Sequence, residues 1–149
     1  RSVHILLFNE RGELLMQRRA DDKDICPCCW DFSAAEHLKP GETTLEGALR
    51  GLEEELGISN QEAPSLELWR PYRLQTYESE ELGIIDNEFV ETYLGEFNGE
   101  LRMDTVELSA LEYWTVERIE TTICQSPEKF TPWFLNEMAY YFQQKKAAR

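Results

Sequence analysis

Three consecutive glutamates, Glu53, Glu54 and Glu55, are the residues of this 149-residue chain that point most directly to chemistry. They lie near the C-terminal end of a predicted helix, where the helix dipole already places partial negative charge. Like charges at such close spacing add repulsion. A bound divalent cation would offset both penalties, and Mg²⁺ typically binds a few carboxylates together with substrate phosphates. A solvated acidic helix face is the alternative interpretation of the three glutamates alone.

The helix that positions these acids is predicted between Thr43 and Gly57. Thr43 and Glu46 have the spacing of a capping box, in which each residue hydrogen bonds to the backbone of the other. Apolar residues then recur at helical spacing at Leu45, Ala48, Leu49, Leu52 and Leu56. Gly57 is typical of the residue that ends a helix in the left-handed conformation. The acids therefore belong to the last turns of this helix.

The segment from Glu36 to Ile58 closely resembles the Nudix box, which reads G-x5-E-x7-R-E-U-x-E-E-x-G-U with U an aliphatic residue. Seven of the nine specified positions match, namely Glu42, Arg50, Leu52, Glu54, Glu55, Gly57 and Ile58. The register also places the loop, the cap and the helix where the motif requires them. The segment is therefore identified as a Nudix box.

Two positions depart from the motif. Glu36 stands where the motif begins with Gly, and Gly51 stands where the motif has the Glu after Arg. In the family that Glu is usually a principal metal ligand, and it shares a helical face with the acids matched by Glu54 and Glu55. Gly51 therefore removes a carboxylate from the expected cluster. Glu36 could replace it from the preceding loop; weakened or redirected catalysis is the alternative.

The resemblance implies a metal-dependent hydrolase that cleaves a diphosphate linkage in a nucleoside diphosphate derivative or a related small diphosphate. Mg²⁺ or Mn²⁺ is the implied cofactor, with the expected ligands Glu36, Glu42, Glu54 and Glu55. Glu54, Glu88 and Glu91 are the candidate general bases, and the resemblance favours Glu88. Arg50 is placed with the catalytic residues because the family's Arg–Glu pair implies that it orients Glu42.

Short matches outside the box resemble the branch of the Nudix superfamily that contains type 1 isopentenyl-diphosphate isomerase and related bacterial Nudix hydrolases. They occur in the same order along most of the chain, at 7–9, 12–15, 18–20, 23, 30, 37, 86–88 and 131–134. The resemblance implies that Arg19 and Lys23 hold a diphosphate and that His37 contacts the phosphate or the metal. Surface charges on an edge strand are the alternative for the two bases.

One residue of the sequence argues against isomerase activity. That mechanism needs a Cys two residues before the motif histidine, and here the position is occupied by Ala35. An isomerase-like protein is therefore a disfavoured alternative to the hydrolase. A catalytically weak Nudix domain that binds a diphosphate ligand is a further alternative, which Gly51 makes credible.

The overall charge limits the classes of binding partner that we expect. Twenty-nine acids against fifteen bases give a formal net charge of −14, which repels polymeric nucleic acid and anionic membranes. No apolar run approaches the ~20 residues of a membrane span. We therefore expect a small-molecule diphosphate as partner, no nucleic acid polymer, no membrane, and a monomer or homodimer.

The four cysteines, Cys26, Cys28, Cys29 and Cys124, do not form the pattern of a disulfide framework. Cys26 and Cys29 form a CxxC pair, which His4, His37 or Cys124 could complete as a zinc site, but zinc sites usually draw on two such pairs. Free thiols in a reducing cytoplasm are the favoured interpretation.

The remaining pattern predicts a single Nudix domain over residues 1–149, an α/β (α+β) fold in which helices flank a mixed central sheet as an α/β/α sandwich. Strands are expected at 2–9, 13–19, 30–35, 67–77, 87–97 and 111–116, with 2–9 and 13–19 forming a hairpin. A short helix should begin at Val116. A last helix should run from Pro132 to about Lys146, with Thr131 as its N-cap.

Overall fold

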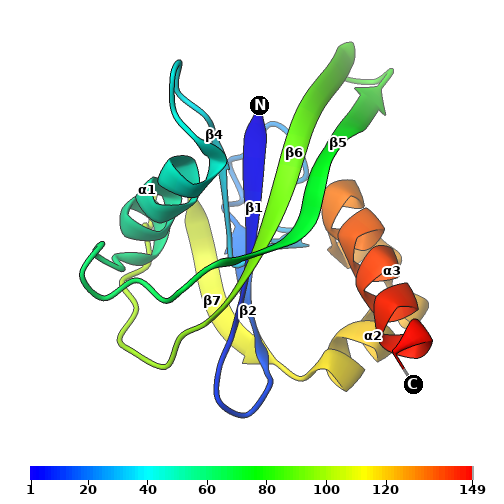
Figure 1. Ribbon diagram of the computed structural model, residues 1–149. Coiled ribbons are helices and arrows are strands. Elements are labelled where there is room, and N and C mark those ends of the chain that lie inside the picture. The colour runs from blue at the N-terminus through cyan, green and yellow to red at the C-terminus, as the bar shows by residue number, and fades with distance from the viewer. Residues whose placement is uncertain (149) are drawn as a thin grey trace.

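The computed structural model describes residues 1–148, which form a seven-stranded mixed sheet with helices on both faces (Figure 1). The elements in chain order are β1 (Ser2–Phe8), β2 (Leu14–Arg19), β3 (Trp30–Asp31), β4 (Ala34–His37), α1 (Thr44–Leu56), β5 (Glu67–Ser79), β6 (Ile84–Glu96), β7 (Leu108–Trp114), α2 (Val116–Gln125), a 3₁₀ turn (Pro127–Lys129) and α3 (Pro132–Ala147). This arrangement confirms the predicted α/β/α sandwich.

The sheet has the strand order β3-β2-β1-β6-β5, with β4 paired to β1 and β7 paired to β2. Only β1 and β6 run parallel among the described strands, and every residue of β1 has a partner on β6. β1 and β2 meet at the pair Phe8–Leu14, whereas the first residues of β1 pair with β4 instead. The strands therefore divide into a β1–β4 arm and a β2–β3–β7 arm that separate from one another.

The strand predicted over 30–35 is instead two strands, one in each arm. β3 pairs with β2, and β4 pairs with β1. The crossing is held by the buried Ser33, whose hydroxyl accepts from the Leu7 amide at 2.8 Å and donates to the Leu15 carbonyl at 2.6 Å. One side chain thus satisfies backbone groups of both arms where they no longer pair with each other.

Two apolar cores hold the layers together, one on each face of the sheet. Leu52 and Leu56 pack α1 against Val3, Ile5 and other residues of the sheet. On the opposite face, aromatic and aliphatic side chains of α2, α3 and the sheet form the second core: Leu6, Met16, Phe32, Ile119, Phe134 and Met138. Complete burial of side chains of this size contributes roughly 1.5–3 kcal/mol each. Within residues 1–148, no helix is both long enough and apolar enough to cross a membrane.

The caps of α1 are those predicted. The Thr43 hydroxyl accepts from the Glu46 amide at 3.1 Å, and the Glu46 carboxylate accepts from the Thr43 amide at 2.9 Å. Gly57 ends the helix with φ of 67°, and its amide donates to the Glu53 carbonyl at 3.1 Å. Strong caps at both ends fix the rotation and extent of α1, and therefore the direction in which its acids point.

Other element limits differ modestly from the prediction. The hairpin of β5 and β6 is longer than expected, because cross-strand pairing continues to the pair Ser79–Ile84. β7 begins earlier, at Leu108, where pairing with β2 starts. The helix that begins at Val116 continues to Gln125. The last helix starts at Pro132 as predicted, with the Thr131 hydroxyl accepting from the Phe134 amide.

We predict that Thr43→Ala lowers the free energy of unfolding by about 1 kcal/mol, because the Glu46 amide loses its acceptor. Urea denaturation measures the change. Thr121→Ala, at an exposed position of α2, is the matched control and should change stability by less than about 0.5 kcal/mol. Equal stability of the two variants would show that the cap contributes nothing.

Candidate active site

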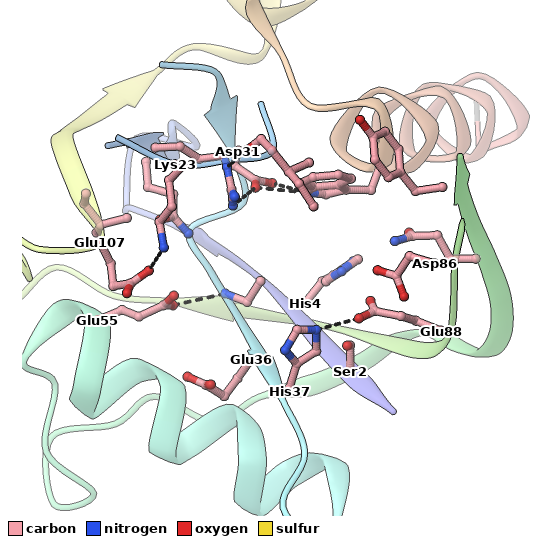
Figure 2. A pocket seen from close by; sticks show the side chains of 18 of the residues that line it. Ser2, His4, Lys23, Asp31, Glu36, His37, Glu55, Asp86, Glu88 and Glu107 are labelled. Carbon is pink, nitrogen blue, oxygen red and sulfur yellow. Dashed lines mark hydrogen bonds and ion pairs between the residues drawn. The ribbon is translucent and has the colours of Figure 1, made fainter. Parts of the chain in front are cut away.

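A pocket of about 520 Å³ lies between the two arms of the sheet and is bordered by α1, the β5–β6 hairpin and the start of α3 (Figure 2). Its volume falls within the ~300–1,000 Å³ typical of small-molecule sites. Carboxylates dominate its walls: Asp31, Glu36, Glu54, Glu55, Asp86, Glu88, Asp104 and Glu107. The basic side chains Arg19 and Lys23 and the two histidines, His4 and His37, line it as well.

The pocket brings together most of the residues singled out from the sequence. Those that line it are Arg19, Lys23, Glu36, His37, Glu54, Glu55 and Glu88. Arg50 and Glu42 are not among its lining residues. Glu53 is exposed and also lies outside the lining, so only two of the three consecutive glutamates face the pocket.

Glu42 is bound by Arg50 rather than directed into the pocket. Arg50 Nε and Nη2 donate to the two carboxylate oxygens of Glu42 at 2.8 and 3.0 Å, in a bidentate pair. The Lys39 amide donates to the same carboxylate at 2.9 Å. Arg50 and this amide lower the pKa of Glu42 to about 2. The structure thus contains the Arg–Glu contact expected from the resemblance, but it places Glu42 as the anchor of Arg50 and apart from the other three expected ligands.

Arg50 also connects the elements that carry the remaining acids. Its Nη2 donates to the His37 carbonyl at 2.8 Å, which fixes the end of β4 against α1. Its Nη1 lies 3.3 Å from Glu54 Oε2 and 3.4 Å from Glu36 Oε1. One guanidinium nitrogen therefore contacts carboxylates from both the helix and the strand and holds them near one another.

Glu36 occupies the space that the missing side chain at position 51 would fill. A Cβ built on Gly51 would lie 3.2 Å from the Glu36 Cβ and 3.6 Å from its Oε2. Gly51 is on α1 and Glu36 is on β4, where its pairing with Val3 directs it toward the helix. The neighbouring strand thus brings a carboxylate next to the position on the helix that lacks one.

Glu55 is a largely buried carboxylate with other acids near it. Burial raises its pKa well above the usual value, and the nearby charges of Glu36, Asp31 and Glu107 raise it further. The Ala35 amide, which donates to Glu55 Oε2 at 3.1 Å, partly opposes the shift. A cation near this carboxylate would favour its charged form.

The donor set suits a hard divalent cation. Within residues 1–148, no three or more His, Cys, Asp or Glu side chains are arranged so closely that they could enclose a metal ion. Mg²⁺ does not need such an enclosure, because it keeps several waters and uses one or two carboxylates with substrate phosphates. Glu36, Glu54 and Glu55 are carboxylates of the pocket lining from which such ligands could come. The same observation gives no support to a zinc site, and the cysteines are free thiols.

The two bases line the pocket in contact with acids. Arg19 Nε donates to the Ile25 carbonyl at 3.1 Å, and its Nη1 lies 3.8 Å from Asp31 Oδ2. Lys23 forms an ion pair with Glu107. Figure 2 shows Lys23 and Glu107 on one side of the pocket and His37, Glu88 and Asp86 on the other. The bases are therefore held where an anionic ligand in the pocket can reach them.

The sequence interpretation missed Asp31 and Glu107. Asp31 is buried and accepts from Trp133 Nε1, the Thr131 hydroxyl and the Phe32 amide. Burial raises its pKa to about 6. An acid inside an apolar strand pattern was the available signal for Asp31. Glu107 had no local signal, because only the pairing of β7 with β2 brings it to the pocket.

The two histidines differ sharply. His37 Nε2 lies 2.5 Å from Glu88 Oε1, and this hydrogen bond raises the pKa of His37 while it lowers the pKa of Glu88. His4 is buried and stacks on Phe32 with ring centroids 4.0 Å apart. Burial, followed by the charges of Arg73 and Arg70, lowers the pKa of His4 well below 6.5.

Comparison with known proteins decides the family. The NUDIX domain model matches residues 1–134. The chain belongs to the Nudix family. An isopentenyl-diphosphate Δ-isomerase of Pectobacterium atrosepticum is 34% identical over 134 residues, which cover 90% of this chain and 72% of the isomerase. An uncharacterised Nudix hydrolase of Listeria innocua is also 34% identical, over 137 residues that cover 91% of this chain and 75% of that protein. The predicted relationship to this branch of the Nudix proteins is therefore confirmed.

Solved structures show the same fold in other Nudix proteins. A MutT protein from Methanosarcina mazei has a TM-score of 0.72 at 20% identity, covering 97% of this chain and 93% of its own. The NUDIX domain of Shewanella oneidensis NrtR, solved with ADP ribose, has a TM-score of 0.69 at 11% identity, covering 96% and 86%. At these identities the likeness concerns the fold alone.

We predict that the two histidines titrate on opposite sides of 6.5. In NMR titrations, His37 should titrate above this value and His4 well below it. Glu88→Gln should lower the pKa of His37, because it removes the charged acceptor, and leave that of His4 nearly unchanged. The pair therefore contributes stability between the lowered pKa of Glu88 and the raised pKa of His37.

Glu91→Gln is the matched control, since Glu91 lies on the same strand but hydrogen bonds to Thr44 instead. It should shift neither histidine. Titration of His37 at or below 6.5 in the wild type would contradict the His37–Glu88 pair.

Proposed function

We propose that this Nudix protein is a metal-dependent hydrolase that cleaves the diphosphate linkage of a nucleoside diphosphate derivative or a related small diphosphate. The observation that carries the proposal is the composition of one pocket, in which the carboxylates Glu36, Glu54 and Glu55 lie with the bases Arg19 and Lys23. Oxygen ligands for a cation and donors for phosphate oxygens are the two requirements of phosphoryl chemistry.

Glu36, Glu54 and Glu55 are the proposed ligands of Mg²⁺ or Mn²⁺. A cation bound there supplies charge neutralisation for the diphosphate and activation of the attacking water. The raised pKa of Glu55 supports this role. It reflects the free-energy cost of holding a charged carboxylate in this environment, and a bound cation would offset that cost. Glu42 is assigned a positioning role instead, through its bidentate pair with Arg50.

The remaining roles follow from contacts. Arg19 and Lys23 bind phosphate oxygens, which take the place of their present partners Asp31 and Glu107. Glu54, which is exposed at the pocket, accepts the proton of the attacking water. Glu88 Oε1 is hydrogen bonded to His37 Nε2 at 2.5 Å, so we assign this pair to ligand positioning.

Isomerase chemistry fits the pocket poorly, although several relatives carry that name. Ala35 lines the pocket at the position where the isomerase-like branch requires a thiol, and its methyl group transfers no proton. Among the described residues that line the pocket there is no cysteine. The position of Glu36 beside Gly51 also weighs against a domain that has lost its carboxylate cluster.

We predict that Glu55→Gln lowers hydrolysis of a diphosphate panel with Mg²⁺ or Mn²⁺ by at least about 100-fold, because losing a metal ligand should cost more than the ~10–100-fold lost with a group that only supports a ligand. Without metal, the same variant should have a higher melting temperature, because a buried charge is removed. Gln retains an oxygen for the Ala35 amide. Phosphate or nucleoside monophosphate release and thermal unfolding are the two measurements.

The stability of the metal-free protein should depend on pH in a definite direction. Because the pKa of Glu55 is higher in the folded state, the metal-free wild type should gain stability as pH falls toward 4.5, and Glu55→Gln should lack this gain. Glu53→Gln, at the exposed neighbouring position, is the control and should leave both measurements near wild type. Undiminished hydrolysis by Glu55→Gln would refute the assignment.

We predict that the carboxylate of Glu36 can be moved to position 51 with little loss of function. Glu36→Gly should weaken Mn²⁺ binding and hydrolysis, because it removes the carboxylate above Gly51. Gly51→Glu alone should also be impaired, since its Cβ would lie only 3.2 Å from that of Glu36 and two carboxylates would compete for one space. The double variant should recover both properties relative to either single variant.

Mn²⁺ affinity is measured by calorimetry, and turnover is measured in parallel, for the wild type, the two single variants and the double variant. Glu36→Gln, which retains the shape of the side chain, separates loss of charge from loss of packing. Purely additive losses in the double variant would show that the two positions do not supply the same carboxylate.

A further inference from the structure

Residues 26–29, between β2 and β3, form a tight turn that we call the cysteine turn. The Cys29 amide donates to the Cys26 carbonyl at 3.3 Å. Proline holds φ at about −65°, and Cys28 has φ of 63°, so Pro27 and Cys28 have the φ values of a type II turn. Such a turn holds its first and last Cα atoms less than ~7 Å apart, and disulfides join Cα atoms at ~4.4–6.8 Å. The backbone therefore already has the separation that a disulfide between the two ends requires.

The thiols of Cys26 and Cys29 lie next to each other in this turn. Each thiol is a hydrogen-bond neighbour of the other, and burial raises the pKa of both. The Cys26 thiol also lies beside the Tyr77 hydroxyl, and the Cys29 thiol donates to the Glu128 carbonyl at 3.7 Å. Both cysteines are free and only partly buried, so a small molecule in solution can reach them.

Backbone carbonyls in and beside the cysteine turn bind the two arginines at the end of β2. Arg19 Nε donates to the Ile25 carbonyl at 3.1 Å, and the Arg19 amide donates to the Cys29 carbonyl at 2.8 Å. Arg18 Nε donates to the Cys28 carbonyl at 3.2 Å. Arg19 and Ile25 line the pocket, whereas the cysteines are not among the described residues of its lining. The turn thus lies behind the pocket wall and helps to position the Arg19 guanidinium.

We propose that Cys26 and Cys29 are a redox-active dithiol that exchanges with small-molecule disulfides, and that its oxidation weakens the binding of an anionic ligand by Arg19. The exchange itself is independent of the hydrolase. The effect on ligand binding rests on the proposed function, because that proposal gives Arg19 its role at the phosphate.

Oxidation by glutathione disulfide takes two thiol–disulfide exchanges. The Cys26 thiol loses its proton to water, and the thiolate attacks one sulfur of glutathione disulfide. The S–S bond breaks, and one glutathione leaves as a thiolate that takes up a proton. The Cys29 thiolate then attacks the Cys26 sulfur of the mixed disulfide and expels the second glutathione. Two protein thiols are thus oxidised by two electrons, and one glutathione disulfide is reduced to two thiols.

Cys26 makes the first attack. Arg19 is the main group that opposes the raised pKa of Cys26, because its positive charge favours the thiolate. Burial, followed by the neighbouring Cys26, raises the pKa of Cys29 to about 11. The thiolate is the nucleophile in the exchange, so the cysteine beside the guanidinium reacts first.

Formation of the disulfide must move the turn. Two bonded sulfurs are only ~2 Å apart, much closer than two thiols in contact, so Cys26 is drawn toward Cys29. The Ile25 carbonyl belongs to the peptide unit that joins Ile25 to Cys26, and it moves with that residue. Arg19 Nε then loses its acceptor. The guanidinium is freed to approach Asp31, whose Oδ2 lies 3.8 Å from Arg19 Nη1, instead of a ligand in the pocket.

The test uses the whole chain in glutathione buffers, with inorganic diphosphate as the ligand. After equilibration with glutathione disulfide, the intact mass should show the loss of two hydrogens, and peptide mapping should join Cys26 to Cys29. Excess reduced glutathione should reverse the reaction. In metal-free buffer, calorimetry should show that the oxidised protein binds diphosphate at least about fivefold more weakly than the reduced protein, the lower end of typical couplings between two sites.

The double variant Cys28→Ser, Cys124→Ser is the matched control, because it retains the proposed pair alone among the four cysteines. It should form the disulfide as the wild type does. Adding Cys29→Ser to this variant should stop the reaction at a mixed disulfide that retains one glutathione on Cys26. Absence of a Cys26–Cys29 disulfide in the control would overturn the dithiol, and equal diphosphate affinities of the oxidised and reduced proteins would overturn the effect through Arg19.

The outcomes also separate the two proposals. A reversible disulfide with redox-dependent diphosphate binding, but without hydrolysis of any diphosphate in Mg²⁺ or Mn²⁺, would support the dithiol and refute the hydrolase. Hydrolysis that depends on Glu55, without a disulfide between Cys26 and Cys29, would support the hydrolase and refute the dithiol.

Discussion

The arrangement of charge in this protein depends on the guanidinium of Arg50. It binds Glu42 through two hydrogen bonds, contacts Glu36 and Glu54 with its third nitrogen, and donates to the His37 carbonyl. The loop before α1, the helix itself and β4 are thereby joined at one point. Removing the guanidinium would leave carboxylates from three elements facing each other without a counterion, which is costly at partly buried positions.

A second constraint is the separation of β1 from β2. Neighbouring strands normally stay paired along their length. Here β1 and β2 separate, and the Ser33 hydroxyl hydrogen bonds to one backbone group of each strand instead. The separation leaves room for the pocket between the two arms. It also allows residues from both arms to face one another, so that the bases near β2 lie opposite the acids near β4 and β6.

The pocket combines groups whose ordinary protonation is disturbed in different directions. Burial raises the pKa of Glu55 and Asp31, Glu88 raises that of His37, and burial lowers that of His4. Perturbed groups gathered in one cavity are characteristic of functional sites. The net charge of −14 does not argue against the proposed diphosphate substrate, because the proposed cation and the bases Arg19 and Lys23 would reverse the sign of the potential locally.

The sequence by itself determined the features that depend on near neighbours in the chain. The caps of α1 and the register of the Nudix box follow from spacings of a few residues. The family followed from that register, and the resemblance in turn implied the Arg50–Glu42 pair. The tertiary structure decided the rest: the division of 30–35 into two strands, the arrival of Glu107 at the pocket, and the position of Glu36 beside Gly51. Each of these depends on which strands pair across long separations, and spacing along the chain carries no record of that pairing.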